Sequence, residues 1–103
     1  MTRVAPAALV QRENDWRDHT VIPFARLRGW KVYFTWRSKN SPSGWPDLVL
    51  CRPPRLILAE LKAADGIVSP AQRAWLDVLE ACPGVEVFVW RPADWPMIEA
   101  ILT

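Results

Sequence analysis

The spacing of apolar residues predicts that the chain begins with a helical segment. Within residues 11–28, apolar side chains recur at helical intervals, for example at Val21 and Phe24. Pro23 interrupts this pattern. Either one helix kinks there, or a second helix begins with Thr20 as its N-cap and the proline in its first turn. The Ala- and Pro-rich residues 1–10 are expected to be partly loose.

Three β-strands are predicted next, after Gly29 has ended the helix. Their β-branched, aromatic and aliphatic residues occupy positions 30–36, 47–51 and 56–62. The third strand is apolar on both faces until its end, which is typical of a central, buried strand. A polar and basic loop over residues 37–44 separates the first two strands, and Pro53-Pro54 lies in the turn between the second and third.

The remainder of the chain predicts a helix, a strand and a short helix. Ser69-Pro70 opens the first of these helices, with proline at the first helical position and Gln72 completing a capping box. Residues 85–90 alternate as a fourth strand, and Asp94 is expected to cap the last helix. The order α-β-β-β-α-β-α predicts an α/β domain with a mixed four-stranded sheet flanked by helices.

The most informative ionisable residues lie in the predicted hairpin of the second and third strands. If the turn centres on Pro53-Pro54, Asp47 lies directly opposite Glu60, with Cβ atoms roughly 4.5–5.5 Å apart. Lys62 is two residues beyond Glu60, so its side chain emerges on the same face. This register is conditional, because a diproline does not form the usual two-residue turn and can add a bulge.

Two carboxylates this close repel each other, and burying them without a partner is costly. A hard divalent cation such as Mg²⁺ or Mn²⁺ relieves the repulsion and leaves positions open for water and a phosphate. A lysine beside the metal can position the attacking water or stabilise charge on phosphorus. The alternative is a cross-strand ion pair at the end of the sheet, which leaves the second acid in an apolar strand unexplained. The pattern therefore favours phosphodiester hydrolysis.

The same residues resemble a known nuclease signature. Gly44-Trp45-Pro46-Asp47, followed by Glu60-Leu61-Lys62, is similar to the PD-(D/E)xK pattern. The core order of that superfamily, the restriction-endonuclease-like αβββαβ(α) arrangement, is the order predicted above. The segments that more closely resemble the VRR-NUC (virus-type replication-repair nuclease) family are GWKVYFTWRS, SGWPDLVLCRPPRLILAELK and SPAQRAWLDVLEACPGVEVFVWRPADW. The similarity extends over about residues 13–102.

This resemblance implies a Mg²⁺- or Mn²⁺-dependent endodeoxyribonuclease. Asp47 and Glu60 would be metal ligands, with the backbone carbonyl of Leu61 as a further one. Lys62 would be the catalytic lysine. Gln72 corresponds to a helix glutamine beside the active site, although it can equally close its capping box alone.

Two further positions of the family pattern are less direct. An acidic residue on the first helix belongs to the pattern as a metal ligand, and Glu13 is our choice, with Asp15 as its rival. Glu13 would otherwise be a solvated acid that suits the helix dipole. Many relatives have a histidine where this chain has Phe34, so any role of that histidine must be absent or relocated.

The charge of the chain is unevenly distributed. The net charge is +2, yet residues 1–55 carry a balance of +6 and residues 56–103 a balance of −4. The basic half allows a surface for an anionic polymer, although an uneven solvated surface would look the same. The residues expected to contact nucleic acid are Arg37, Ser38 and Lys39, and this surface is extended by Arg12, Arg17, Arg26, Arg28 and Lys31.

The tryptophans and cysteines complete the candidate residues. Trp36 and Trp45 flank the basic loop and are placed to stack on splayed bases. A core or a subunit interface would explain Trp30, Trp75 and Trp90, whereas Trp95, at the start of the last helix, is placed to belong to an interface. Cys51 and Cys82 lack metal-ligand spacing and are expected to be small buried hydrophobes.

Length and composition predict one domain over residues 1–103, with no membrane span or signal peptide, in the cytoplasm of a bacterium or a phage host. The first hypothesis is a homodimeric endonuclease that selects flap or Holliday-junction-like DNA. The alternative is a catalytically silent nucleic-acid-binding module of a phage or replication and repair complex. Because Asp47, Glu60 and Lys62 are all intact, the enzyme is favoured.

Overall fold

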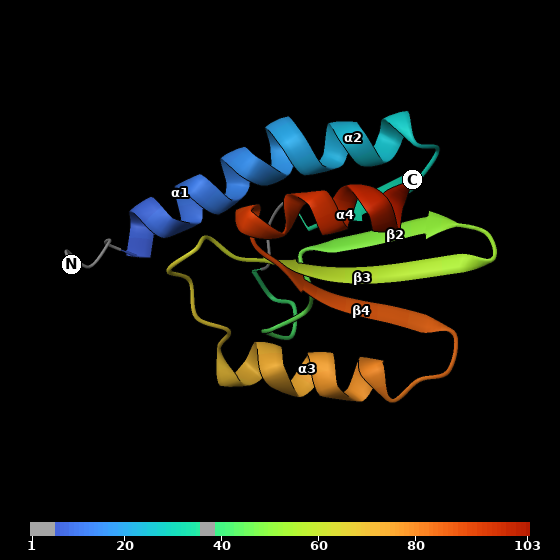
Figure 1. Cartoon of the computed structure of the whole chain (residues 1–103). Helices are drawn as coiled ribbons and strands as arrows, with labels where there is room; N and C mark the ends of the chain where they lie inside the picture. Colours follow the sequence, from blue (N-terminus) through green and yellow to red (C-terminus); the bar gives the residue numbers. More distant parts are fainter. Residues whose placement is uncertain (1–5, 36–38) are drawn as a thin grey trace.

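The computed structural model describes residues 6–35 and 39–103. The elements, in chain order, are α1 (Pro6–Trp16), the π-helical turn η1 (Arg17–Val21), α2 (Ile22–Leu27), β1 (Lys31–Phe34), β2 (Leu48–Arg52), β3 (Arg55–Leu61), α3 (Pro70–Glu80), β4 (Val85–Trp90), the 3₁₀ turn η2 (Pro92–Asp94) and α4 (Trp95–Leu102). Helices α1, α2 and α4 lie on one side of the sheet and α3 on the other (Figure 1). The predicted α/β fold is confirmed.

The sheet has the order β1-β2-β3-β4, with β1, β2 and β3 antiparallel and β4 parallel to β3. The predicted hairpin register is correct, since Leu48 pairs with Ala59 and Arg52 with Arg55. The bulge that a diproline can add does not occur. Pro53-Pro54 forms a two-residue turn with a cis peptide bond, the arrangement of a type VI turn, and the register passes through it without a bulge.

The first helical segment begins before the predicted residue 11 and has no second N-cap. Helix α1 begins at Pro6, so residues 6–10 are helical, and residues 1–5 lie outside the described residues. Thr20 is not an N-cap, because the chain stays helical through η1, where the amide of Ile22 donates to the carbonyl of Arg17. Pro23 has no N–H to donate, and the wider π turn beside it lets the helix continue.

The core lies between the sheet and the helices α2 and α4. Its fully or almost fully buried members include Val21, Ala25, Trp30, Leu48, Leu50, Ile57, Leu61, Trp90, Ile98 and Leu102. Both cysteines were wrongly expected inside: Cys51 and Cys82 are exposed. Cys51 alternates with the buried Leu50 along β2, so its side chain points to the opposite face of the sheet.

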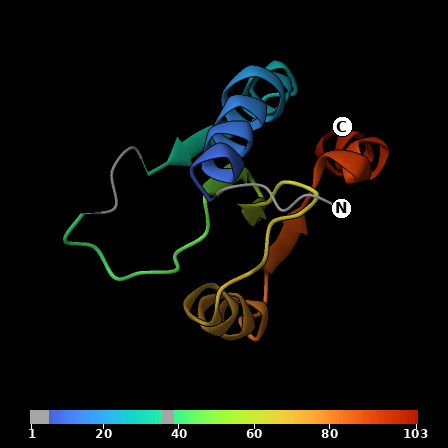
Figure 2. The same cartoon turned by 90° about the vertical axis from the view of Figure 1, so that its left-hand side faces the viewer.

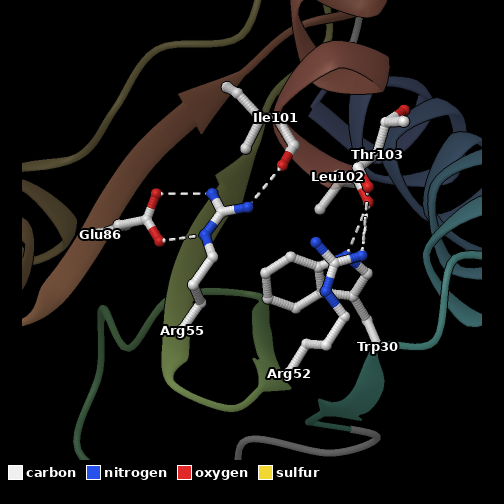
Figure 3. Close-up of polar contacts among 7 residues, drawn as sticks. All are labelled: Trp30, Arg52, Arg55, Glu86, Ile101, Leu102 and Thr103. Carbon is white, nitrogen blue, oxygen red and sulfur yellow. Dashed lines mark hydrogen bonds and ion pairs between the residues drawn. The ribbon is translucent and has the colours of Figure 1, made fainter.

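The hairpin turn and the end of α4 are joined by a cluster around Trp30 (Figure 3). The indole Nε1 donates to the carbonyl of Leu102 at 2.9 Å, and Arg52 donates to the same oxygen at 3.1 Å. Arg55 donates to the carbonyl of Ile101 at 2.9 Å. Both guanidinium groups also lie against the Trp30 ring, 4.5 and 5.1 Å from its centre. These contacts satisfy carbonyls at the helix C-terminus, where positive charge is favourable.

Candidate active site

Asp47 and Glu60 are neighbours at the end of the sheet where β3 and β4 finish. Asp47 comes directly before β2, and its carboxylate accepts a hydrogen bond of 2.8 Å from the amide of Leu61. Glu60 belongs to β3 and is 1% exposed. Burial, together with the hydrogen bond and charge of Asp47, raises the pKa of Glu60 to about 9. The two acids therefore cannot both be ionised at neutral pH without a further partner.

The arrangement of donor atoms fits a divalent cation. Glu60 Oε2 is buried and has no hydrogen-bond partner among the described residues. Carboxylate oxygens are the ligands that Mg²⁺ and Mn²⁺ prefer. Within residues 6–35 and 39–103, no three acidic, histidine or cysteine side chains gather closely enough to hold a metal by themselves. The coordination shell of such an ion would therefore need water, a phosphate or a backbone carbonyl beside Asp47 and Glu60.

Lys62 lies one residue beyond β3 and is only 9% exposed. Its amide donates to the carbonyl of Trp90 at 3.0 Å, which extends the pairing of β3 and β4 by one residue. Its ammonium group is close enough to lower the pKa of Glu60, partly opposing the effect of Asp47. The predicted grouping of Asp47, Glu60 and Lys62 is thus found in the structure.

Of the two acids of the first helix, Glu13 is the one that lies beside the site. Its Oε1 accepts a hydrogen bond of 3.2 Å from the amide of Ala63, and its charge contributes to the raised pKa of Glu60. Asp15 is exposed and accepts from the side chain of Gln11 instead. A Cβ atom on Gly66 would lie 2.8 Å from Glu13 Oε1, so this glycine leaves room for the carboxylate.

Gln72 has both of the roles that its sequence position allowed. Its Oε1 accepts from the amide of Ser69 at 2.8 Å, and its own amide donates to Ser69 Oγ at 3.2 Å, which forms the predicted capping box. With the oxygen held by Ser69, the Nε2 group is directed to Glu60 Oε1, at 3.3 Å. The cap of α3 thereby sets the orientation of a side chain that contacts the buried acid.

The loop that carries Asp47 packs closely on the start of α3. Gly44 has φ +95°, and a Cβ atom there would lie 2.5 Å from the backbone carbonyl of Ala71. Only glycine satisfies both the positive φ and the close approach. The backbone conformation and the packing on α3 therefore require a glycine in the Gly-Trp-Pro-Asp segment, independently of the chemistry of Asp47.

Arg91 is a residue of the site that the motifs did not indicate. Its Nη1 donates to the carbonyls of Ala63 and Gly66, both at 2.7 Å, and so holds the loop that follows Lys62. Because β3 and β4 are parallel, the residues after them meet at the same edge of the sheet. That topological rule was the only signal in the sequence that places Arg91 here.

The expected nucleic-acid contacts are only partly described. Arg37, Ser38 and Trp36 lie outside the described residues, and Lys39 is exposed. Arg12 pairs with Asp65 at 3.6 Å, which links α1 to the loop after β3. Arg17 pairs with Asp18 at 2.8 Å and lies over the ring of Phe34, the residue at the histidine position of relatives. Of the tryptophans assigned to a core or interface, Trp30 and Trp90 are buried, and Trp95 packs against the core.

The fold and the Asp47–Glu60–Lys62 group define an α/β domain of nuclease type. A family model described as the VRR-NUC domain matches residues 2–94, so the chain belongs to that family of nucleases. A solved structure described as a "VRR_NUC domain protein" shares the fold, with a TM-score of 0.60 and 18% identity over 86% of this chain and 84% of that one. The comparison with curated proteins gave no match. None of the described helices is long and apolar enough to cross a membrane.

Proposed function

We propose that this protein is a divalent-metal-dependent endodeoxyribonuclease. The observation that carries the proposal is the buried Glu60, which lies beside a second carboxylate and has one oxygen without a partner. Asp47 and Glu60 would hold Mg²⁺ or Mn²⁺, with the backbone carbonyl of Leu61 as a further ligand. When bound, such a metal activates water and stabilises negative charge on a phosphate.

The side chains around this pair have distinct tasks in the proposal. Lys62 is shielded from solvent, where its charge acts more strongly on a phosphate or an attacking water than it would in bulk water. Gln72 holds one oxygen of Glu60 and so directs the other to the metal. Glu13 holds the peptide that follows Lys62, which makes it a positioning residue or an additional ligand. Lys39 extends from the loop toward solvent, where a phosphate can be reached.

The test is cleavage of labelled DNA in the presence of Mn²⁺ or Mg²⁺. We expect Lys62→Ala to lower the rate by at least 100-fold, because a buried electrostatic contact to the reacting phosphate is lost. Arg73→Ala is the control: Arg73 is an exposed basic residue of α3 that pairs with Asp77 at 3.0 Å and lies outside the predicted nucleic-acid surface. Absence of cleavage by both the wild type and Lys62→Ala under all metal conditions would refute the enzymatic proposal.

We also propose that the enzyme selects branched DNA and works as a homodimer. A domain of 103 residues has little surface with which to read a base sequence, which favours recognition of a flap or a Holliday-junction-like structure. Two copies would present two sites to two strands. Cleavage of a panel of flaps, junctions and plain duplexes tests the first point, and light scattering of the purified protein tests the second.

The alternative is a silent nucleic-acid-binding module of a phage or repair complex. It predicts salt-sensitive DNA binding that is unchanged by Asp47→Asn and no cleavage by the wild type. The retained Lys62 next to the acidic pair favours the enzyme, since a binding module needs neither.

A further inference from the structure

A groove of about 730 Å³ opens beside Asp47 at the β1 edge of the sheet. One wall is formed by α1 and β1, and the other by α3 and the segment that ends at Asp47. Figure 2 shows that residues 39–47, which precede β2, lie to one side of the sheet at a level between α1 and α3. Asp47 and Gln72 belong to the lining, so the groove is continuous with the candidate active site.

Aromatic side chains face this groove from both walls. Trp45 is 39% exposed, and its ring meets that of Trp75 at 5.0 Å in an edge-to-face arrangement. Tyr33, on β1, is 63% exposed. Exposed aromatic groups in a concave surface are typical of ligand sites. Trp75 was expected in a core or a subunit interface, and the structure places it in the lining of this groove instead.

Among the described residues that line the groove, the polar groups are mainly neutral. Asn14, Thr35 and Ser43 can exchange hydrogen bonds with a sugar or with the edge of a base. The charged Arg17 in the lining is already paired with Asp18. This composition differs from that of a track for successive phosphates, which would present unpaired Lys and Arg side chains. Its size is within the usual range for a site that encloses a small organic ligand, roughly 300–1,000 Å³.

We propose that this groove holds an unpaired nucleotide of the DNA strand, with its base stacked on Trp45. A base inside a duplex has both faces covered by its neighbours, so an aromatic wall of this kind accepts only a base that has left the stack. Because Asp47 lies in the same lining, the phosphate next to that nucleotide would be the one brought to the acidic pair. The proposal rests on the proposed nuclease function. It adds that the substrate differs from plain duplex DNA by an unpaired nucleotide beside the cleaved bond.

Binding without turnover tests this proposal. The protein carries Lys62→Ala, which is expected to slow cleavage at least 100-fold, and a chelator removes free metal. The probe is a duplex with a two-nucleotide gap that contains 2-aminopurine opposite the gap. The same duplex without the gap is the reference. Stacking on Trp45 predicts quenching of 2-aminopurine in the gapped probe only. Trp45→Ala should weaken binding of the gapped probe roughly 5- to 150-fold and leave the intact duplex unchanged, since one stacked base is lost.

Matched variants keep the test decisive. Trp45→Phe should restore most of the affinity, because the aromatic face is kept. Tyr33→Ala removes an exposed side chain of the opposite wall and should also weaken the gapped probe alone. Leu27→Ala, at an exposed apolar position outside the lining, should change neither probe.

The outcomes separate the two proposals. Equal affinity of all variants for both probes, with a wild type that cleaves DNA, overturns the groove proposal and leaves the nuclease function in place. Loss of gapped-probe binding in Trp45→Ala and Tyr33→Ala, with a wild type that cleaves nothing, supports the nucleotide site and overturns the nuclease function instead.

Discussion

The buried acid of the site should make the stability of the metal-free protein depend on pH. The pKa of Glu60 rises from its ordinary value of 4.5 to about 9 in the folded protein. Between these values the folded chain holds a proton that the unfolded chain has released. The contribution of Glu60 to stability is therefore fully present below pH 4.5 and is lost progressively as the pH rises to about 9.

The size of the effect follows from the proton count. One proton bound in the folded state alone changes the free energy of unfolding by about 1.4 kcal/mol per pH unit. Between pH 6 and pH 8 the loss of stability is therefore about 3 kcal/mol. Domains of this size have a total stability of only about 5–15 kcal/mol, so the change is readily measurable. Glu60→Gln keeps the shape of the side chain and removes this titration.

The assay is urea unfolding, followed by tryptophan fluorescence, at several pH values in the presence of a chelator. We expect the stability of the wild type to fall between pH 6 and pH 8 more steeply than that of Glu60→Gln, by about 1.4 kcal/mol per pH unit. Added Mn²⁺ should restore the wild type at pH 8, because the metal binds the ionised pair, and should affect the variant less. Equal slopes for the two proteins would show that Glu60 holds no proton, and the account of the pair would be wrong.

Three further substitutions test the supports of the site and the core, each by urea unfolding. Gly44→Ala should lower the free energy of unfolding by about 2–4 kcal/mol, because φ is positive and the added Cβ has no space. Gly84→Ala should lower it by only about 1–2 kcal/mol, because φ is also positive, at +81°, but no atom lies within 4 Å of the added Cβ. Equal losses would exclude the close approach at Gly44 as the cause. Ser69→Ala should cost about 1 kcal/mol through loss of the cap, and Ser69→Asp should recover it. Trp30→Phe should lower the free energy of unfolding by about 1–3 kcal/mol, because the buried hydrogen bond to the Leu102 carbonyl is lost while Arg52 still donates to that oxygen. An unchanged free energy of unfolding would show that the indole N–H contributes nothing.

The part of the site that lies on the hairpin could be predicted from sequence. Side chains alternate along a strand, so a turn at Pro53-Pro54 leaves one register that pairs Leu48 with Ala59 and places Asp47 beside Glu60. The capping box at Ser69 was equally local, because its partners are three residues apart. In both cases short-range geometry decides the position of the side chain.

Residues whose position depends on packing were predicted less well. Glu13 and Asp15 differ by two positions on one helix, and it is the placement of α1 beside the loop after β3 that brings Glu13 to the amide of Ala63. Trp75 reads as a core residue because it is large and apolar. It is half-buried instead, because α3 packs against β4 while the Trp75 ring contacts that of Trp45 in the lining of the groove.

The least predictable contacts are those made through the backbone. The peptide unit of Ala63 accepts from Arg91 and donates to Glu13, so three separate segments of the chain meet at one small residue beside Lys62. A sequence pattern identifies charged residues such as the two carboxylates and the lysine, because their proposed chemistry depends on the side chain itself. It does not identify Arg91, whose partners are carbonyl oxygens that every residue possesses. The two carboxylates and the lysine are therefore visible in the sequence, while the residues that hold them in place become visible only when the parallel pairing of β3 and β4 is known.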